Sequence, residues 1–358
     1  MVTASQEGRF LVVAKQFSYE NLSRYRTVLM GLQIILIICF HFAVDGYYVR
    51  DSRIIYLFYK YIRSSGVDMF LLLSGVGLYF SWKKTPVIKT FYLKRYTRIL
   101  IPYFLVAIPA WIWLDVFYLN AGWGKFFEDL FFLTFFFEQT RWFWYILMIG
   151  FCYLVFPYLF AIVETAGERI TRNMRILVLC LTSTLVLMLL QLYYTELYSS
   201  VSIALSRIPA FLIGVLIGKA VYEKQVVSRK YLYVMLILAI VIAWPLQMVS
   251  TKILGVYSLA FLNYELSLLF VMILNWLHEN KNRWLVRLHI VITSVLGWFG
   301  KYTLELYLIH VLVRKVMKGY GYPTYRFIYE GILVGISIVL SICLNRIAGM
   351  LQKKIQIV

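Results

Sequence analysis

Long apolar segments recur along almost the whole of this 358-residue chain. About ten of them are long enough to cross roughly 30 Å of hydrocarbon at about 1.5 Å of helical rise per residue. They fall at 27–46, 66–82, 99–119, 142–163, 175–194, 203–221, 230–249, 255–277, 291–314 and 325–347. A segment inside a membrane must satisfy its own backbone hydrogen bonds, so each is predicted to be helical. The chain is therefore predicted to be an all-α, polytopic membrane bundle of about ten transmembrane helices.

The composition excludes an ordinary soluble protein. Hydrophobic residues make up 62% of the chain and charged residues only 15%, whereas about a quarter of a soluble globular chain is charged. The chain has a net charge of +19, but its sequence contains no basic tail and no nucleic-acid-binding module. We therefore expect contact with anionic lipid and no nucleic-acid partner. The four cysteines lie inside apolar runs without disulfide or zinc spacing, and no metal site is expected.

Basic residues in the connecting segments predict the orientation of the bundle. With the N-terminus inside, the inner segments hold about 23 Lys and Arg and the outer segments about 11. Both termini are therefore predicted to be cytoplasmic, in a multi-pass protein of the plasma or inner membrane. We expect a cytoplasmic N-terminal segment at 1–26, a transmembrane domain at 27–347 and a cytoplasmic tail at 348–358. The short stretch Phe126–Phe137 is predicted to be interfacial or re-entrant.

Ionisable residues inside the predicted spans mark a candidate site, because such groups are costly in lipid. The predicted topology places His41, Asp68, Arg207 and His310 in the outer half of the bundle. Glu265 and Glu305 also fall within spans, where a catalytic role and a structural ion pair are both open.

A histidine with a carboxylate partner is the minimum for general-base chemistry on a hydroxyl. His41 is predicted to be the base, and Asp68 is predicted to fix its tautomer and stabilise the imidazolium. The alternative is a structural histidine bonded to a neighbouring carbonyl. Arg207 is a candidate for holding an oxyanion or a substrate hydroxyl, and Trp144 is a candidate for stacking on a sugar. A structural ion pair and an interfacial aromatic belt are the respective alternatives.

A second group of basic residues lies at the inner face. Arg95 and Arg98 are three residues apart and share one helix face. With Lys94 they could grip the phosphates of coenzyme A; the alternative is an ordinary basic flank of a span. Because these residues lie inside and His41 outside, we expect a channel through which the pantetheine arm presents its thioester to the histidine.

Six ordered fragments of the chain resemble the acyltransferase 3 family of membrane acyltransferases. They are Met30–His41, Gly66–Gly75, Phe91–Pro102, Trp144–Pro157, Arg207–Gly214 and Gly300–His310. Each is weak alone, but together they cover nearly the whole bundle in the expected order.

The resemblance implies a function in cell-envelope polysaccharide modification. Members transfer an acyl group, usually acetyl, from cytoplasmic acyl-CoA to a hydroxyl of a glycan or lipid-linked sugar. Acyl-CoA, acetyl-CoA in the usual case, is then a donor substrate, and no bound cofactor is expected. His41 matches the histidine to which catalysis is attributed, and Arg95 and Arg98 match the family's Arg-x-x-Arg motif. One departure is Met30, where members commonly carry a basic residue; Arg26 lies one helical turn earlier.

Two functions from other classes compete with O-acylation. A transporter or flippase for lipid-linked sugars would also have many spans and intramembrane charges, but it usually shows internal repeats, and none is detectable here. A polymerase-like glycosyltransferase would be expected to have large outer loops, whereas the outer loops predicted for this chain are short. Two small-xxx-small patterns, at Gly214 and Gly218 and at Gly331 and Gly335, predict close helix contacts.

Overall fold

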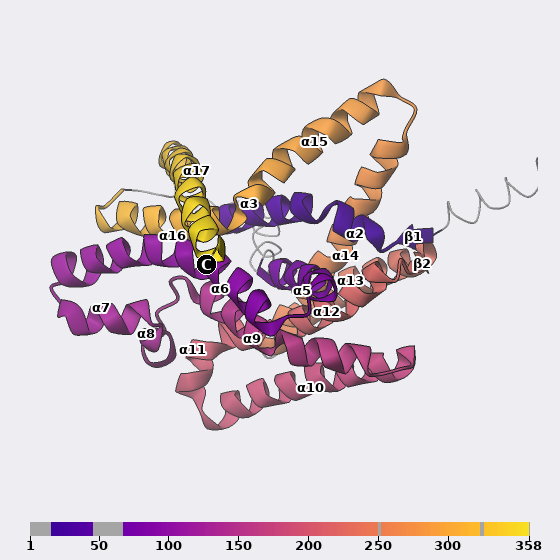
Figure 1. Ribbon diagram of the computed structural model, residues 1–358, viewed down its shortest axis with the longest axis horizontal. Helices are drawn as coiled ribbons and strands as arrows, with labels where there is room; N and C mark the ends of the chain where they lie inside the picture. The colour runs from indigo at the N-terminus through magenta and orange to yellow at the C-terminus, as the bar shows by residue number, and fades with distance from the viewer. Residues whose placement is uncertain (1–15, 46–66, 250–251, 323–325, 358) are drawn as a thin grey trace, which may run out of the picture.

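The computed structural model describes residues 16–45, 67–249, 252–322 and 326–357. Twelve long helical elements build the bundle in this part of the chain. They are α3 (Arg26–Asp45), α5 (Val67–Lys84), α6 (Ile88–Trp111), α9 (Trp144–Glu164), α10 (Arg169–Tyr193), α11 (Thr195–Leu205), α12 (Ile208–Tyr222), α13 (Arg229–Val249), α14 (Lys252–Glu279), α15 (Arg283–Lys301), α16 (Thr303–Gly319) and α17 (Phe327–Ile357). Figure 1 shows the α14–α15 hairpin projecting at one end of the molecule and the short helices α7 and α8 at the other.

The predicted helical membrane fold is confirmed. Seven helical stretches among the described residues are long and apolar enough to cross a membrane; the count of ten spans stays a prediction. One small element departs from the all-helical pattern: β1 (Gln16–Ser18) pairs antiparallel with β2 (Val226–Ser228). This pair joins the segment before α3 to the α12–α13 connection. A short helix, α2 (Glu20–Arg24), links β1 to α3.

Two of the predicted spans are divided. The segment 203–221 is interrupted at Ser206 and Arg207, between α11 and α12, and the segment 291–314 is interrupted at Tyr302, between α15 and α16. The predicted tail at 348–358 continues α17 as far as residue 357. Hydropathy alone does not reveal such breaks, because the apolar composition continues across them.

The segment between α6 and α9 forms an irregular cap. A π-helix (Ile112–Tyr118) extends α6, and α7 (Gly122–Leu130) and α8 (Leu133–Phe137) follow it. Asp129 accepts a hydrogen bond from the Thr134 hydroxyl across the α7–α8 turn. Burial raises the pKa of the Asp129 carboxyl, while this hydrogen bond opposes the shift. The two short helices fit the expectation that this stretch does not cross the membrane.

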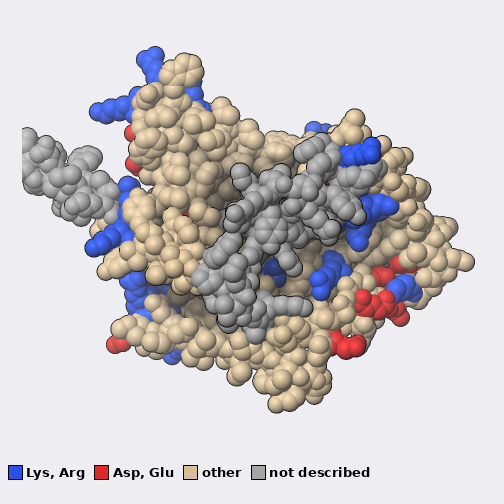
Figure 2. All heavy atoms as spheres, turned by 180° about the vertical axis from the view of Figure 1, so that it is seen from behind, with Lys and Arg blue, Asp and Glu red and all other residues tan. Residues whose placement is uncertain are grey.

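Acidic residues gather at one end of the bundle, whereas basic residues lie at both ends. Figure 2 shows Lys and Arg at the α14–α15 hairpin and along the edge below it, and at the opposite end a group of Asp and Glu with further Lys and Arg beside it. The α7–α8 cap contributes Glu128 and Glu138, both of which pair with Lys125. The cytoplasmic placement of the α14–α15 end stays a prediction.

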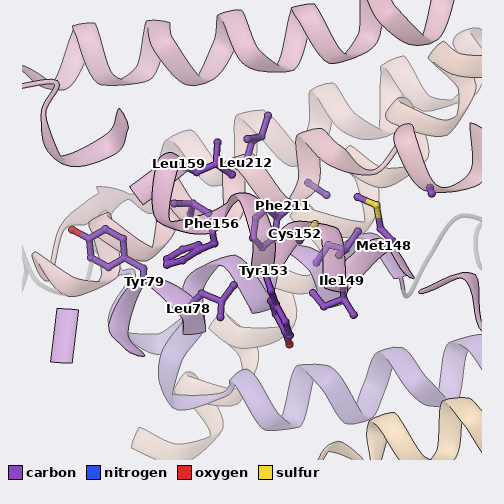
Figure 3. Close-up of a cluster of buried hydrophobic side chains, with 14 of the residues drawn as sticks. Leu78, Tyr79, Met148, Ile149, Cys152, Tyr153, Phe156, Leu159, Phe211 and Leu212 are labelled. Carbon is purple, nitrogen blue, oxygen red and sulfur yellow. The ribbon is translucent and has the colours of Figure 1, made fainter. Parts of the chain in front are cut away.

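Aromatic packing joins α5, α9 and α12 at the centre. Tyr79, Phe156 and Phe211 are fully buried, and Figure 3 shows these side chains meeting from the three helices. At one end of this core the Glu164 carboxylate of α9 binds Lys83 Nζ of α5 at 2.6 Å and Lys219 Nζ of α12 at 2.7 Å. Apolar burial and one shared carboxylate therefore hold the same three helices together.

Glycines permit the closest helix crossings. A Cβ added to Gly214 would lie 2.2 Å from the Leu72 carbonyl oxygen, and one added to Gly218 would lie 2.7 Å from the Tyr79 Cβ. These two contacts confirm the prediction for Gly214 and Gly218. The prediction for Gly331 and Gly335 is wrong, since both are exposed and a Cβ at either position meets no described residue within 4 Å. Small residues allow a close approach, but another helix must also face them.

Candidate active site

A cavity of ≈ 330 Å³ lies among α3, α5, α6, α9, α15, α16 and α17. Its wall includes the predicted site residues Arg98 and Glu305, and the aromatic side chains Tyr145 and Tyr307. Met30, the position at which the chain departs from the family pattern, also lines it. Five of the six family-like fragments therefore contribute to the cavity, whereas the Arg207–Gly214 fragment does not, and α17 supplies the rest of the wall.

The break between α15 and α16 forms part of the cavity wall. Gly300, Lys301, Thr303 and Glu305 surround the break and all line the cavity. Irregular backbone at membrane depth is tolerated where it lines a cavity, because the freed polar groups can then be solvated or bound. Glu305 is fixed there by Asn345 of α17, whose Nδ2 donates to Oε1 at 2.8 Å.

The Arg-x-x-Arg pair opens onto one end of this cavity. Arg98 is exposed and lines the wall, whereas Arg95 is half-buried with its guanidinium 5.9 Å from the centre of the Phe91 ring. In the part of the chain that the structure describes, the Nε of Arg95 is buried without a hydrogen-bond acceptor. Lys94 is exposed and lies outside the cavity wall. Of the three predicted phosphate-binding residues, the structure therefore brings Arg98 to the cavity and Arg95 beside it.

A row of aromatic rings leads from the cavity to the two histidines. The Tyr145 and Tyr307 rings are 5.5 Å apart, and Tyr307 is 6.2 Å from His310. The His310 ring is 5.3 Å from that of His41. The C-terminal part of α3 and the middle of α16, almost 270 residues apart in sequence, thus place two imidazoles in contact.

The tautomer of neutral His310 follows from its contacts. Nδ1 lies 2.6 Å from the Leu306 carbonyl oxygen, which can only accept a hydrogen bond, so Nδ1 carries the proton. Nε2 is then an acceptor, and it is buried without a hydrogen-bond partner among the described residues. This arrangement suits a group that accepts a hydroxyl proton or hydrogen bond better than one that donates to an oxyanion.

Asp68 and Arg207 form a second polar group. Arg207 Nε lies 3.7 Å from Asp68 Oδ2, and the Asp68 side chain is only 2% exposed. The guanidinium also donates to the Ile203 carbonyl at 2.6 Å and lies 5.4 Å from the centre of the Trp144 ring. The break between α11 and α12 positions Arg207 for these contacts. Asp68 thus has Arg207 as its charged partner in the described part of the chain, and its predicted action on His41 stays a prediction.

Sequence reasoning did not single out Tyr145, Tyr307 or Asn345. The two tyrosines lie inside the fragments Trp144–Pro157 and Gly300–His310, and this position in the sequence could have identified them as candidates. Asn345 gave a weaker signal, as one amide within an apolar run. Glu265 is buried in α14, and its Oε2 has no hydrogen-bond partner among the described residues. It lies outside the cavity wall.

Comparison with known proteins identifies one family. The model of the Acyl_transf_3 family, described as an acyltransferase domain, matches residues 28–346. No curated protein and no solved structure matches the chain. The match spans α3 to α17 and therefore includes every residue of the cavity and the histidine pair except those beyond residue 346.

Proposed function

Because the chain belongs to the acyltransferase 3 family of integral membrane acyltransferases, we propose that it acetylates a carbohydrate outside the cytoplasm. The donor is cytoplasmic acyl-CoA, in the form of acetyl-CoA, and the acceptor is a hydroxyl of a cell-surface or lipid-linked glycan. One observation carries this proposal: Arg98, Tyr145 and Tyr307 line one cavity, and ring contacts continue from Tyr307 to His310 and His41. This arrangement suits a donor whose charged and reactive ends lie far apart.

The donor is bound with its phosphates at the arginine end. Arg95 and Arg98 contact the phosphates, and the exposed Lys94 adds positive charge nearby. The pantetheine arm lies in the cavity beside Tyr145 and Tyr307, where its amides meet polar groups and its methylenes meet apolar ones. The thioester then lies close to the histidine pair.

His41 acts as the general base. It removes the proton of the acceptor hydroxyl as the oxygen attacks the thioester carbonyl carbon. The tetrahedral intermediate collapses, the carbon–sulfur bond breaks, and the imidazolium returns its proton to the thiolate of coenzyme A. His310 Nε2 accepts a hydrogen bond from the acceptor hydroxyl or from His41, and so holds the reacting groups in place.

Arg207 and Asp68 support the same reaction. Arg207 stabilises the developing oxyanion, and Trp144 and Asp68 hold its guanidinium in position. Asp68 also supplies negative charge near the site where an imidazolium develops. Trp144 is the proposed acceptor-side aromatic residue, and Glu305 orders the donor end of the cavity through Asn345.

Filling the cavity tests this proposal. Gly349 lines the cavity, and a Cβ added there meets nothing within 4 Å. Gly349→Leu should therefore fold but exclude the pantetheine arm, weakening acetyl-CoA binding and lowering acyl transfer together. Gly335→Leu is the matched control, because Gly335 lies on the same helix, is exposed and has equally open space. Equal donor affinity and transfer rate in both variants would contradict the donor route; transport of a lipid-linked sugar without acyl transfer would favour the flippase.

A further inference from the structure

Three arginine side chains converge near the cavity without an acidic partner. Arg26 begins α3, and its guanidinium is close enough to those of Arg95 and Arg98 of α6 for the three positive charges to repel one another; the neutral Tyr153 phenol of α9 also lies nearby. Among the described residues, none of the three guanidinium groups takes part in an ion pair. Like charges that are partly withdrawn from water repel one another, so this arrangement is costly until an anion joins it.

The backbone of α5 is shaped to admit Arg26. A Cβ added to Gly77 would lie 1.7 Å from Arg26 Nη1 and 3.0 Å from its Cζ. The half-buried guanidinium therefore occupies the space that a side chain at position 77 would fill. Gly77 is three residues from Ser74, which lines the cavity, as does Tyr153. Arg26 thus lies directly beside the cavity wall.

An ordinary basic flank of a membrane span does not explain this arrangement. Flanking residues extend toward water, as the exposed Lys89 and Lys94 do. Arg26 and Arg95 are instead half-buried, and Arg95 Nε is buried with no acceptor among the residues that the structure describes. The Glu164 carboxylate is already shared between Lys83 and Lys219. The Glu305 carboxylate, in the same cavity wall as Arg98, is held by Asn345 and forms no ion pair with any of the three arginines among the described residues. A bound anion would supply the neutralising charge.

We propose that Arg26 is a third phosphate-binding residue, which grips the acyl-CoA phosphates together with Arg95 and Arg98. This inference rests on the proposed donor and adds to it a residue outside the Arg-x-x-Arg motif. Gly77 is the positioning residue, because any larger side chain there displaces the guanidinium. Met30 lies one turn further along α3 and lines the cavity itself. An arginine at position 30 could therefore reach the same anion from the next turn of the helix.

Calorimetric titration of coenzyme A into the full-length protein, held in nanodiscs of neutral phosphatidylcholine, tests this inference. Arg26→Gln should weaken binding about tenfold, which corresponds to about 1.4 kcal/mol, the size of one lost charge-assisted hydrogen bond. Gly77→Ala should cause a similar loss with all three arginines still present. Arg26→Gln combined with Met30→Arg should recover part of the affinity. Arg24→Gln is the control, because Arg24 is exposed and donates to Asn275 instead.

The outcomes separate this inference from the proposed function. Wild-type protein that binds no coenzyme A would overturn both. Wild-type protein that binds it, with Arg26→Gln and Gly77→Ala binding equally tightly, would overturn only the role of Arg26. A second arm uses nanodiscs that contain phosphatidylglycerol. If Arg26→Gln alters retention of that lipid but leaves coenzyme A affinity unchanged, the arginines hold a lipid head group and the inference is also wrong.

Discussion

The crossing of α3 and α15 should be far more sensitive to a methyl group at Gly300 than at Gly297. A Cβ added to Gly300 would lie 1.9 Å from the Thr27 carbonyl oxygen, about 1.5 Å short of the ordinary contact distance of 3.4 Å. Backbone atoms cannot change rotamer, so the helices must separate. Overpacking of this kind costs about 1–3 kcal/mol, and we expect the upper end of that range for Gly300→Ala.

Gly297 supplies the matched control on the same helix. A Cβ there meets nothing within 4 Å, so Gly297→Ala should gain about 0.5–1 kcal/mol from the greater helix propensity of alanine. Thermal unfolding in one detergent should place the Tm of Gly300→Ala about 4 °C below the wild type, and that of Gly297→Ala at or slightly above it. Because Gly300 also lines the cavity, Gly300→Ala should weaken acetyl-CoA binding as well. Indistinguishable Tm values for the two variants would refute the close crossing.

Three other predictions concern the donor, the acceptor side and the orientation. Replacing Arg95 and Arg98 together with Gln should weaken donor binding at least tenfold without affecting membrane insertion; unchanged coenzyme A affinity would leave them as topological anchors. Asp68→Asn should lower kcat more than it changes KM, because Arg207 loses its charged partner; a pure KM effect in steady-state kinetics would contradict this role. Reporter fusions at the two termini should both report a cytoplasmic location. If either terminus lies outside, the prediction that His41, Asp68, Arg207 and His310 share the outer half of the bundle is wrong.

Apolar patterning predicted most of the helices but not their interruptions. The runs at 27–46 and 142–163 correspond closely to α3 and α9, because hydropathy and length are properties of each segment alone. The interruption at Tyr302 depends on tertiary contacts: Gly300 docks against α3, and the residues that follow line the cavity. The position of this break is therefore set by the neighbouring helices.

The same distinction applies to the candidate site: its individual residues could be predicted from the sequence, but their partners could not. Ionisable side chains inside predicted membrane spans are costly in lipid whatever their partners. This cost was enough to identify each of four candidates individually: His41, Asp68, Arg207 and His310. Their partners depend on helix rotation and on contacts between distant segments. Asp68 therefore meets Arg207, and His310 meets His41, in pairs that no local spacing predicts. The glycines give a similar lesson, since Gly214 packs against α5 whereas Gly331 meets open space.

The central claim is that His41 is the base that activates the acceptor hydroxyl. The most direct measurement compares wild-type and His41→Ala protein in the same nanodiscs, recording acetyl-CoA affinity and the rate of acetyl transfer to the acceptor glycan. We predict that His41→Ala binds acetyl-CoA as the wild type does, because its phosphate grip and cavity are intact, and that transfer falls at least about a hundredfold. A folded His41→Ala protein that binds the donor and transfers acetyl at a near-normal rate would contradict the account.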